Sequence, residues 1–261
     1  MIHTETKAPD SIRVLAVDAD IVAWRCSAVS EGESEDDLKS TVDNFLYTIV
    51  ECTGVNEMKL FLTPKTNFRY KLAITKPYKG NRKDGYRPEH LTTAKEYMKE
   101  RYGAMIIEGY EADDCIASMM TKYEGAAHAG IDKDIKQIAG WHFDFVKHTW
   151  HYTDEDESAL RIYRQVCQGD TTDNIPGLKG VGEKKAARFV TEPDRAREQA
   201  LAAYKAKLAP MPDDDIVTYF SEQEMLIRMI TTLNIPFDPV TVEVPPPLLA
   251  EEEEGFEGFD E

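Results

Sequence analysis

The sequence predicts an α/β fold in which a mostly parallel sheet is followed by an all-helical region. Three observations support this fold class. Short apolar runs of strand length alternate with segments of helical periodicity up to residue 155, acidic residues recur where those runs end, and only helical periodicity remains from residue 156 onward. Strands that alternate with helices are typical of parallel sheets, because a parallel crossover needs a connection of helix length.

The first part of the chain supplies the strands and helices of this sheet. The run 12–17 is apolar and short, as expected for a buried strand. The segment 37–52 carries apolar residues at helical spacing, and Gly54 follows as a stop signal. Further strands are expected at 58–62, 104–107, 127–131, 142–146 and 149–152, and further helices at 89–102 and 112–123.

The segment after the second strand has no clean period. Residues 63–88 combine Pro, Gly and Asn with many basic residues, which predicts a long functional loop or arch, taken with its flanking helix as 63–100. Later helices are expected at 157–168, 182–190, 194–208 and 214–233. The sequence thus predicts an α/β core at 1–155 that includes the arch, a helical region at 156–238, and a Pro-rich linker with a disordered acidic tail at 239–261.

The composition indicates a globular chain without a membrane anchor. Hydrophobic residues make up 42% of the sequence and charged residues 30%, which excludes a disordered chain. The sequence has neither an apolar run of membrane-spanning length nor an apolar N-terminal signal segment, so we expect no membrane association and no secretion. The 4 cysteines are scattered without a Cys-x-x-Cys pair, which favours a reducing cytoplasm over a disulfide framework or a zinc knuckle.

The charge is distributed unevenly along the chain. The formal net charge is −17, which taken alone argues against a nucleic-acid partner. Residues 59–101, however, carry 12 basic and 4 acidic residues with aromatic residues among them, whereas the tail 251–261 holds 7 acids and no base. This asymmetry predicts a local phosphate-binding zone, a carboxylate-rich site and an acidic tail, although solvated faces would also account for charge runs.

The acidic residues after the predicted strands are the candidate chemical groups. The carboxyl ends of parallel strands meet at one edge of a sheet, so these acids should converge in one crevice. Clustered carboxylates repel one another unless cations intervene, and oxygen-only ligands favour Mg²⁺ or Mn²⁺, here as two ions. Singly, each acid could also favour a helix N-terminus or a turn. The candidates are Asp18, Glu111, Asp113, Asp114, Asp132, Asp134, Asp170 and Asp173.

A glycine-containing turn follows the last of these acids. Gly180 and Gly182 flank a valine and lead into a predicted helix that carries Lys184 and Lys185. Glycine lets a backbone approach a phosphate closely, and a helix N-terminus offers free N–H groups. The segment therefore predicts a helix-hairpin-helix phosphate clamp, with a simple helix-connecting turn as the alternative.

The densest basic segment lies in the predicted arch at residues 76–83. Lys79 and Arg82 are candidates for stabilising charge on a phosphate, and Lys83 is a candidate DNA contact. Tyr78 is expected to offer a surface on which an unpaired base stacks. The alternative is an exposed basic loop that binds nucleic acid without specificity.

Together these motifs resemble the flap endonuclease or 5′–3′ exonuclease family, in its bacterial and bacteriophage branch. The matching stretches are 14–20, 78–82, 109–114, 131–134 and 169–182. The resemblance implies a PIN-like α/β core, a helical arch that passes a 5′ single strand, and a helix-three-turn-helix element that grips duplex DNA.

The resemblance also implies roles for single residues. Lys79 and Arg82 correspond to the arch residues that contact the scissile phosphate, and Tyr78 to the adjacent aromatic. The glycine turn corresponds to the phosphate clamp, often with a monovalent cation such as K⁺. The acids correspond to the ligands of a first metal region (Asp18, Glu111, Asp113, Asp114 and Asp132) and of a second (Asp134, Asp170 and Asp173).

Two features depart from the family pattern. The second strand is followed by Thr63 and Pro64, where the family usually has a metal-binding aspartate. The acidic tail, with Phe256 and Phe259, resembles acidic tips by which replication proteins dock a basic partner.

The leading functional hypothesis is a monomeric, cytoplasmic, metal-dependent 5′ nuclease that acts on DNA with a 5′ single-stranded flap or end. It would serve replication, repair or recombination in a bacterium or phage. One alternative is a catalytically weakened, structure-specific DNA-binding or docking protein. Another is a ribonuclease that acts on RNA–DNA hybrids.

Overall fold

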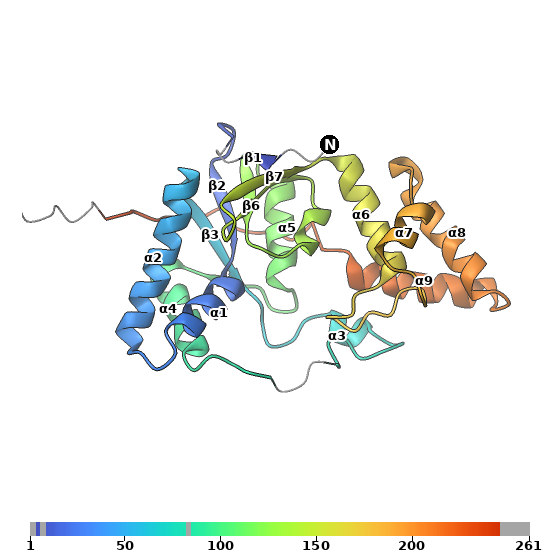
Figure 1. The fold of residues 1–261 in the computed structure, drawn as a ribbon, viewed down its shortest axis with the longest axis horizontal. Coiled ribbons are helices and arrows are strands. Elements are labelled where there is room, and N and C mark those ends of the chain that lie inside the picture. The colour runs from blue at the N-terminus through green and yellow to red at the C-terminus, as the bar shows by residue number, and fades with distance from the viewer. Residues whose placement is uncertain (1–3, 6–8, 82–84, 246–261) are drawn as a thin grey trace, which may run out of the picture.

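The computed structural model describes residues 4–5, 9–81 and 85–245 and shows an α/β core beside a helical region (Figure 1). The described strands form one sheet in the order β1-β7-β6-β5-β2-β3-β4, with β8 also paired to β3. Their bounds are β1 Thr4–Glu5, β2 Val14–Asp18, β3 Glu57–Leu62, β4 Met105–Ile106, β5 Ala126–Ala129, β6 Gly140–Asp144, β7 Thr149–Thr153 and β8 Val240–Thr241. The central strands are parallel and the pairings that involve β1, β7 and β8 are antiparallel, so the predicted fold class is confirmed.

Helices cover both faces of the sheet. Leu15 and Val17 of β2 pack in a cluster with α1, α2 and α4, while Val14 and Ala16, which point the other way, pack with α5. In Figure 1, α1, α2 and α4 lie to one side of the sheet and α6 to α9 lie beyond its other end. The helices are α1 Ala19–Val29, α2 Glu35–Thr53, α3 Arg69–Leu72, α4 Leu91–Tyr102, α5 Ala112–Lys122, α6 Glu155–Gln168, α7 Glu183–Phe189, α8 Ala196–Leu208 and α9 Asp213–Ile227, with 3₁₀ turns at Asp134–Gln137 and Pro193–Arg195.

The helical region has a core of its own. Tyr204 and Phe220 are fully buried between α6, α8 and α9, and their rings stack edge-to-face with centroids 5.2 Å apart. Tyr78, which comes from the segment between α3 and α4, also belongs to this cluster. The predicted arch is therefore attached to the helical region as well as to the α/β core.

The structure differs from the predicted elements in several places. Strand β1 was not predicted, and α9 ends at Ile227, whereas the sequence predicted a helix to residue 233. Helix α1 begins directly after β2 and was not predicted. The predicted helical arch contains, within its described residues before α4, only the four-residue helix α3. Val240 and Thr241, expected in a free linker, form β8 against β3, and Val242 is buried. Residues 246–261, which include the predicted acidic tail, lie outside the described residues.

Among the helices of the described residues, none combines the length and the apolar character that crossing a bilayer requires.

Three histidines form a row across neighbouring strands of the sheet. His142 is the register partner of both His128 on β5 and His151 on β7. Its Nε2 lies 2.9 Å from the carbonyl oxygen of Ile138 and its Nδ1 lies 3.4 Å from Nδ1 of His128. Burial lowers the pKa of His142 to about 3, with the charges of His151, Lys136 and Arg161 acting in the same direction. The imidazole of His142 is therefore buried in its neutral form.

We expect His142 to make the folded state sensitive to acid. Its pKa is lower in the folded chain than the ordinary value of about 6.5 in the unfolded chain, so the unfolded state binds more protons as the pH falls. Stability should therefore fall below about pH 6.5, by up to about 1.4 kcal/mol for each pH unit. Urea unfolding of wild type and His142→Gln at several pH values measures this, because the carboxylates titrate in both proteins and cancel in the difference.

The variant His148→Asn removes an exposed histidine instead of a buried one and is the matched control. A wild type and a His142→Gln variant that lose stability in parallel below pH 6.5 would show that His142 is not the cause.

Candidate functional site

Six of the eight predicted acids line one cavity between the α/β core and the helical region. The cavity has a volume of about 200 Å³ and is also lined by Arg69, Tyr78 and Lys79. The acids along its wall are Glu111, Asp113, Asp132, Asp134, Asp170 and Asp173. They come from the start of α5, from the loop after β5 and from the loop after α6, so residues distant in the sequence share one space.

Asp18 sits at the base of this group, where β2 becomes α1. Its Oδ1 accepts hydrogen bonds from the backbone N–H groups of Asp20 and Ile21 at 3.1 and 3.2 Å, which makes it the N-cap of α1. The same residue thus ends the strand and begins the helix. Its side chain is buried, and its charge acts on the carboxyl of Asp113.

A short loop after α6 presents two further acids. Asp170 and Ile175 exchange backbone hydrogen bonds of 2.8 and 2.7 Å, which closes the loop into a hairpin, defined here as residues 169–177. Oδ1 of Asp170 accepts from the N–H groups of Thr172 and Asp173. These bonds orient the Asp170 carboxylate from within the hairpin.

The carboxyls repel one another strongly. Burial, and then the charges of Asp20 and Asp132, raise the pKa of Asp18 to about 7. Burial, then Asp132 and Asp170, likewise raises the pKa of Asp134 to about 7. The pKa of Asp113 is raised well above its ordinary value, first by burial and then by Asp18 and Asp132. A cation placed among these groups would relieve this cost.

The donor chemistry of the cavity suits a hard divalent cation, because its acidic ligands are all oxygen donors. Across the part of the chain that the structure describes, however, no group of three or more His, Cys, Asp or Glu side chains is arranged to hold an ion. The acids share a cavity without forming a closed coordination sphere.

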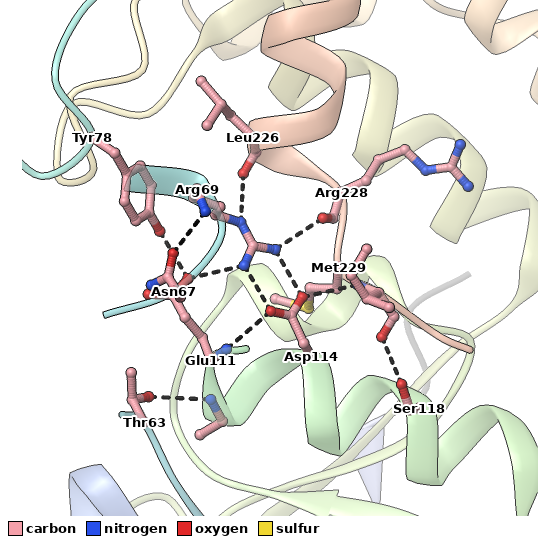
Figure 2. Close-up of polar contacts among 12 residues, drawn as sticks. Thr63, Asn67, Arg69, Tyr78, Glu111, Asp114, Ser118, Leu226, Arg228 and Met229 are labelled. Atoms are coloured by element: carbon pink, nitrogen blue, oxygen red, sulfur yellow. Dashed lines mark hydrogen bonds and ion pairs between the residues drawn. The ribbon is translucent and has the colours of Figure 1, made fainter. Parts of the chain in front are cut away.

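Asp114 faces an arginine rather than the cavity (Figure 2). Its two oxygens accept from both terminal nitrogens of Arg69, at 2.7 and 2.8 Å, and from the N–H groups of Glu111 and Ile230. Arg69 also donates to the carbonyl oxygens of Leu226 and Arg228. Both residues are almost fully buried, so this pair joins α3, α5 and the end of α9.

Tyr78 differs from the expected stacking surface. Its side chain is only 4% exposed, and its hydroxyl lies 2.9 Å from Oε2 of Glu111 and 2.7 Å from Oδ2 of Asp173. The ring packs in the core of the helical region, so no face is free for a base. The structure gives Tyr78 a role in orienting two acids instead.

Lys79, a basic residue of the predicted arch, enters the cavity beside the acids. Its ammonium group contacts Oε1 of Glu111 and lies 3.8 Å from Oδ2 of Asp173. Its backbone has a positive φ of 55° and its N–H donates to the carbonyl oxygen of Asp173. Arg82 and Lys83, the other predicted phosphate contacts, lie outside the described residues.

The predicted phosphate clamp lies on the loop before α7. Gly180 has a φ of 72°, a conformation that favours glycine, and Gly182 directly precedes the helix. Lys184 is exposed, and the ammonium group of Lys185 donates to the carbonyl oxygen of Gly180 at 2.8 Å. These residues do not line the acid cavity.

Sequence reasoning missed Asp20 and Arg69. Asp20 accepts from the N–H of Thr63 at 2.8 Å and from Lys95 at 2.5 Å, so a carboxylate from α1 reaches the end of β3. The Asp18-x-Asp20 spacing was the available signal for Asp20. For Arg69 there was none, because its partners are remote in the sequence.

The chain is similar in sequence to known proteins over less than half of its length. No family model matches the chain. It is 31% identical to a DNA polymerase I of Deinococcus radiodurans over 114 residues, which is 39% of this chain and 12% of the polymerase. It is 28% identical to a 5′–3′ exonuclease of Bacillus subtilis over 144 residues, which is 47% of this chain and 48% of the exonuclease. The chain thus spans half or less of the length of these curated relatives.

Solved structures share the fold over most of the chain. The 5′-exonuclease of bacteriophage T5, solved with divalent metal ions (zinc), has a TM-score of 0.63 at 18% identity and covers 84% of this chain and 90% of its own. The catalytic core of Rad2, solved with a DNA substrate, has a TM-score of 0.51 at 13% identity and covers 90% of this chain and 85% of its own. The chain therefore has the PIN-like fold of these nucleases.

We expect the Arg69–Asp114 pair to be essential for stability. Removing one partner of a buried ion pair leaves the other charge unpaired, which costs about 3–5 kcal/mol. Arg69→Met and Asp114→Asn should each lower the free energy of unfolding by about this amount, measured by urea denaturation. The exposed pair Lys205–Asp213 is the control, because Lys205→Met should cost less than about 1 kcal/mol. Equal losses in the buried and exposed pairs would contradict this assignment.

Proposed function

We propose that this chain is a metal-dependent 5′ nuclease that hydrolyses phosphodiester bonds of DNA near the junction of a 5′ single strand and a duplex. The observation that carries the proposal is the single cavity in which carboxylates of the α/β core and of the hairpin meet Lys79. Relatives named 5′–3′ exonuclease and DNA polymerase I, together with the fold of T5 5′-exonuclease, support it.

Two divalent ions, Mg²⁺ or Mn²⁺, fit the donors of the cavity. Bound there, such ions supply a more acidic water and offset charge on the reacting phosphate oxygens. We assign Asp18, Glu111, Asp113 and Asp132 to a first metal region and Asp134, Asp170 and Asp173 to a second. Asp114, whose oxygens are taken by Arg69 and backbone N–H groups, positions Glu111 at the start of α5.

The other residues bind and orient the substrate. Lys79 places a positive charge among the acids, where it can contact the scissile phosphate and stabilise its developing charge. Tyr78 holds Glu111 and Asp173 in place through its hydroxyl. Arg82 and Lys83 are proposed as further phosphate contacts on the same segment, and the loop before α7, with a bound K⁺, as the clamp on the duplex.

The biological setting forms part of the same proposal. The T5 enzyme has been solved with DNA and metal ions, and Rad2 with a DNA substrate, so DNA is the proposed substrate here as well. We propose a monomer that acts in the cytoplasm of a bacterium or phage-infected cell during replication, repair or recombination. The acidic tail is proposed to dock a basic replication protein.

One observation favours a weakened nuclease that mainly binds DNA. At the end of β3, Thr63 and Pro64 provide no carboxylate, and the hydroxyl of Thr63 instead accepts from the N–H of Ala112. This rival predicts binding of flap DNA with little turnover.

The other alternative is a ribonuclease that acts on RNA–DNA hybrids. Comparing the cleavage rates of DNA, RNA and hybrid flaps separates the proposed DNA nuclease activity from that of a ribonuclease.

Divalent ions should stabilise the folded chain. When the free ion concentration is about 100 times the dissociation constant, binding adds about 2.7 kcal/mol to the free energy of unfolding. This corresponds to a rise in melting temperature of about 5 °C or more. Asp134→Asn should raise the melting temperature of the metal-free protein, because it removes repulsion, and should reduce the shift produced by Mn²⁺. Asp215→Asn, at an exposed position, is the control that keeps the full shift. A shift that is the same in both variants would argue against a metal site at the cavity.

Cleavage of a labelled 5′-flap DNA with Mg²⁺ tests the activity itself. Asp170→Asn combined with Asp173→Asn should lower the rate roughly 100-fold or more, since it removes two proposed metal ligands. Asp214→Asn combined with Asp215→Asn makes the same change of charge at exposed positions of α9 and should cleave like wild type. Absence of cleavage by the wild type, with flap binding retained, would favour the DNA-binding rival.

A further inference from the structure

Helix α9 contacts two functional segments through one of its faces. Residues 219, 222, 223 and 226 are spaced by three and four positions, so they lie along the same side of the helix. This side meets the arch segment, defined here as residues 63–81 and 85–90 between β3 and α4, and also the hairpin 169–177. The proposed nuclease reaction involves neither of these contacts directly.

Glu222 holds the arch segment. Its Oε1 accepts from the N–H groups of Ile74 and Thr75, both at 2.7 Å, and its Oε2 accepts from the hydroxyl of Thr75. The residue is only 7% exposed. Hydrogen bonds to a buried carboxylate are stronger than those between neutral groups, and here three of them fix one short stretch of chain.

The next residues of the same face hold the hairpin. Oε1 of Gln223 accepts from the N–H of Gly177 at 3.1 Å, and the hydroxyl of Tyr219 donates to the carbonyl oxygen of Gly177 at 2.9 Å. Gly177 has a φ of 55°, and a side chain there would meet the backbone N of Gly169 at 2.4 Å. Helix α9 therefore binds the hairpin at Gly177, where the two ends of the hairpin lie closest together.

The arch segment and the hairpin also touch each other directly. The N–H of Lys79 donates to the carbonyl oxygen of Asp173 at 2.9 Å, and the side-chain amide of Asn174 donates to the carbonyl oxygen of Pro77 at 2.9 Å. Lys79 faces the acids from this junction. A shift of the arch segment relative to α9 would move the lysine relative to the acids.

We propose that α9 sets the arch segment in register with the hairpin, and that Glu222 is the positioning residue that fixes the arch side of this link. The exposed residues after Thr75 lead directly to Tyr78 and Lys79. The hydrogen bonds of Glu222 to residues 74 and 75 therefore determine where Tyr78 and Lys79 enter the cavity. The effect on cleavage rests on the proposed nuclease function, whereas the anchoring itself does not.

The chain offers a matched control on the same helix. Glu224 is 8% exposed, nearly the same as Glu222, but its partners are Arg197 of α8 and Tyr163 of α6. Removing Glu224 should disturb the helical region without freeing the arch segment. Any general loss of stability of α9 should therefore appear in both variants.

Amide hydrogen exchange on the full-length, metal-free protein tests the anchor. In Glu222→Ala the amides of residues 74 and 75 should exchange about 10-fold faster or more, because they lose their acceptor. Glu224→Ala should leave them protected. Glu222→Gln keeps an oxygen that accepts from both amides and should restore the protection. Unchanged exchange in Glu222→Ala, or the same increase in Glu224→Ala, would overturn the proposal.

Kinetics on a 5′-flap DNA with Mg²⁺ then test the consequence. For Glu222→Ala we expect kcat/KM to fall about 10-fold relative to Glu224→Ala, with recovery in Glu222→Gln. Equal values in the two alanine variants would show that the anchor does not position the reacting groups. If the wild type cleaves no DNA, the proposed nuclease function fails, while the exchange comparison still decides whether Glu222 holds the arch segment.

Discussion

The crowding of carboxylates around one cavity is the constraint on which the rest of this structure depends. Burial and mutual repulsion raise the pKa of Asp18, Asp113 and Asp134, so the folded chain is under electrostatic strain where these residues meet. Part of that strain is offset by groups from the segment between β3 and α4. Arg69 and Lys79 each pair with Glu111, whose charge is one of those that raise the pKa of Asp113, so the arch segment offsets negative charge at the cavity.

Arg69 and Lys79 have different roles. Burial alone would lower the pKa of Arg69, but its hydrogen bonds to Asp114 and the charge of that carboxylate more than reverse this effect. Its three guanidinium nitrogens are all engaged, so the side chain is committed to the fold. The ammonium group of Lys79 contacts acids of the cavity and lies over the ring of Tyr78, 4.9 Å from its centroid. It is the cation that can turn to a phosphate.

The sequence predicted strands β2 to β7 along the chain because each is a short apolar run, and acids mark where several of these runs end. It did not predict α1. The buried residues Ala19, Val22, Ala23 and Cys26 lie along one side of that helix, but most of them are small, and the larger apolar residues Trp24 and Val29 are exposed, which leaves only a weak apolar stripe. Strand β8 was missed because its pairing with β3 is remote in the sequence and its own residues precede a Pro-rich stretch. Local pattern carries no information on such pairings.

The same limit explains the errors within the site. An acid at a strand end can be recognised from the sequence, but whether its oxygens face a cavity or an arginine is decided by chain segments far away, as Asp114 shows. Tyr78 looked like an exposed aromatic of a basic loop, yet α6 and α9 form a core that takes up its ring. Both residues orient Glu111. Asp114 accepts from the backbone N–H of Glu111, and the hydroxyl of Tyr78 contacts the carboxylate of Glu111. A carboxylate that lies among other carboxylates is held in place by neighbouring side chains. Those neighbours cannot be identified from the pattern of acids in the sequence.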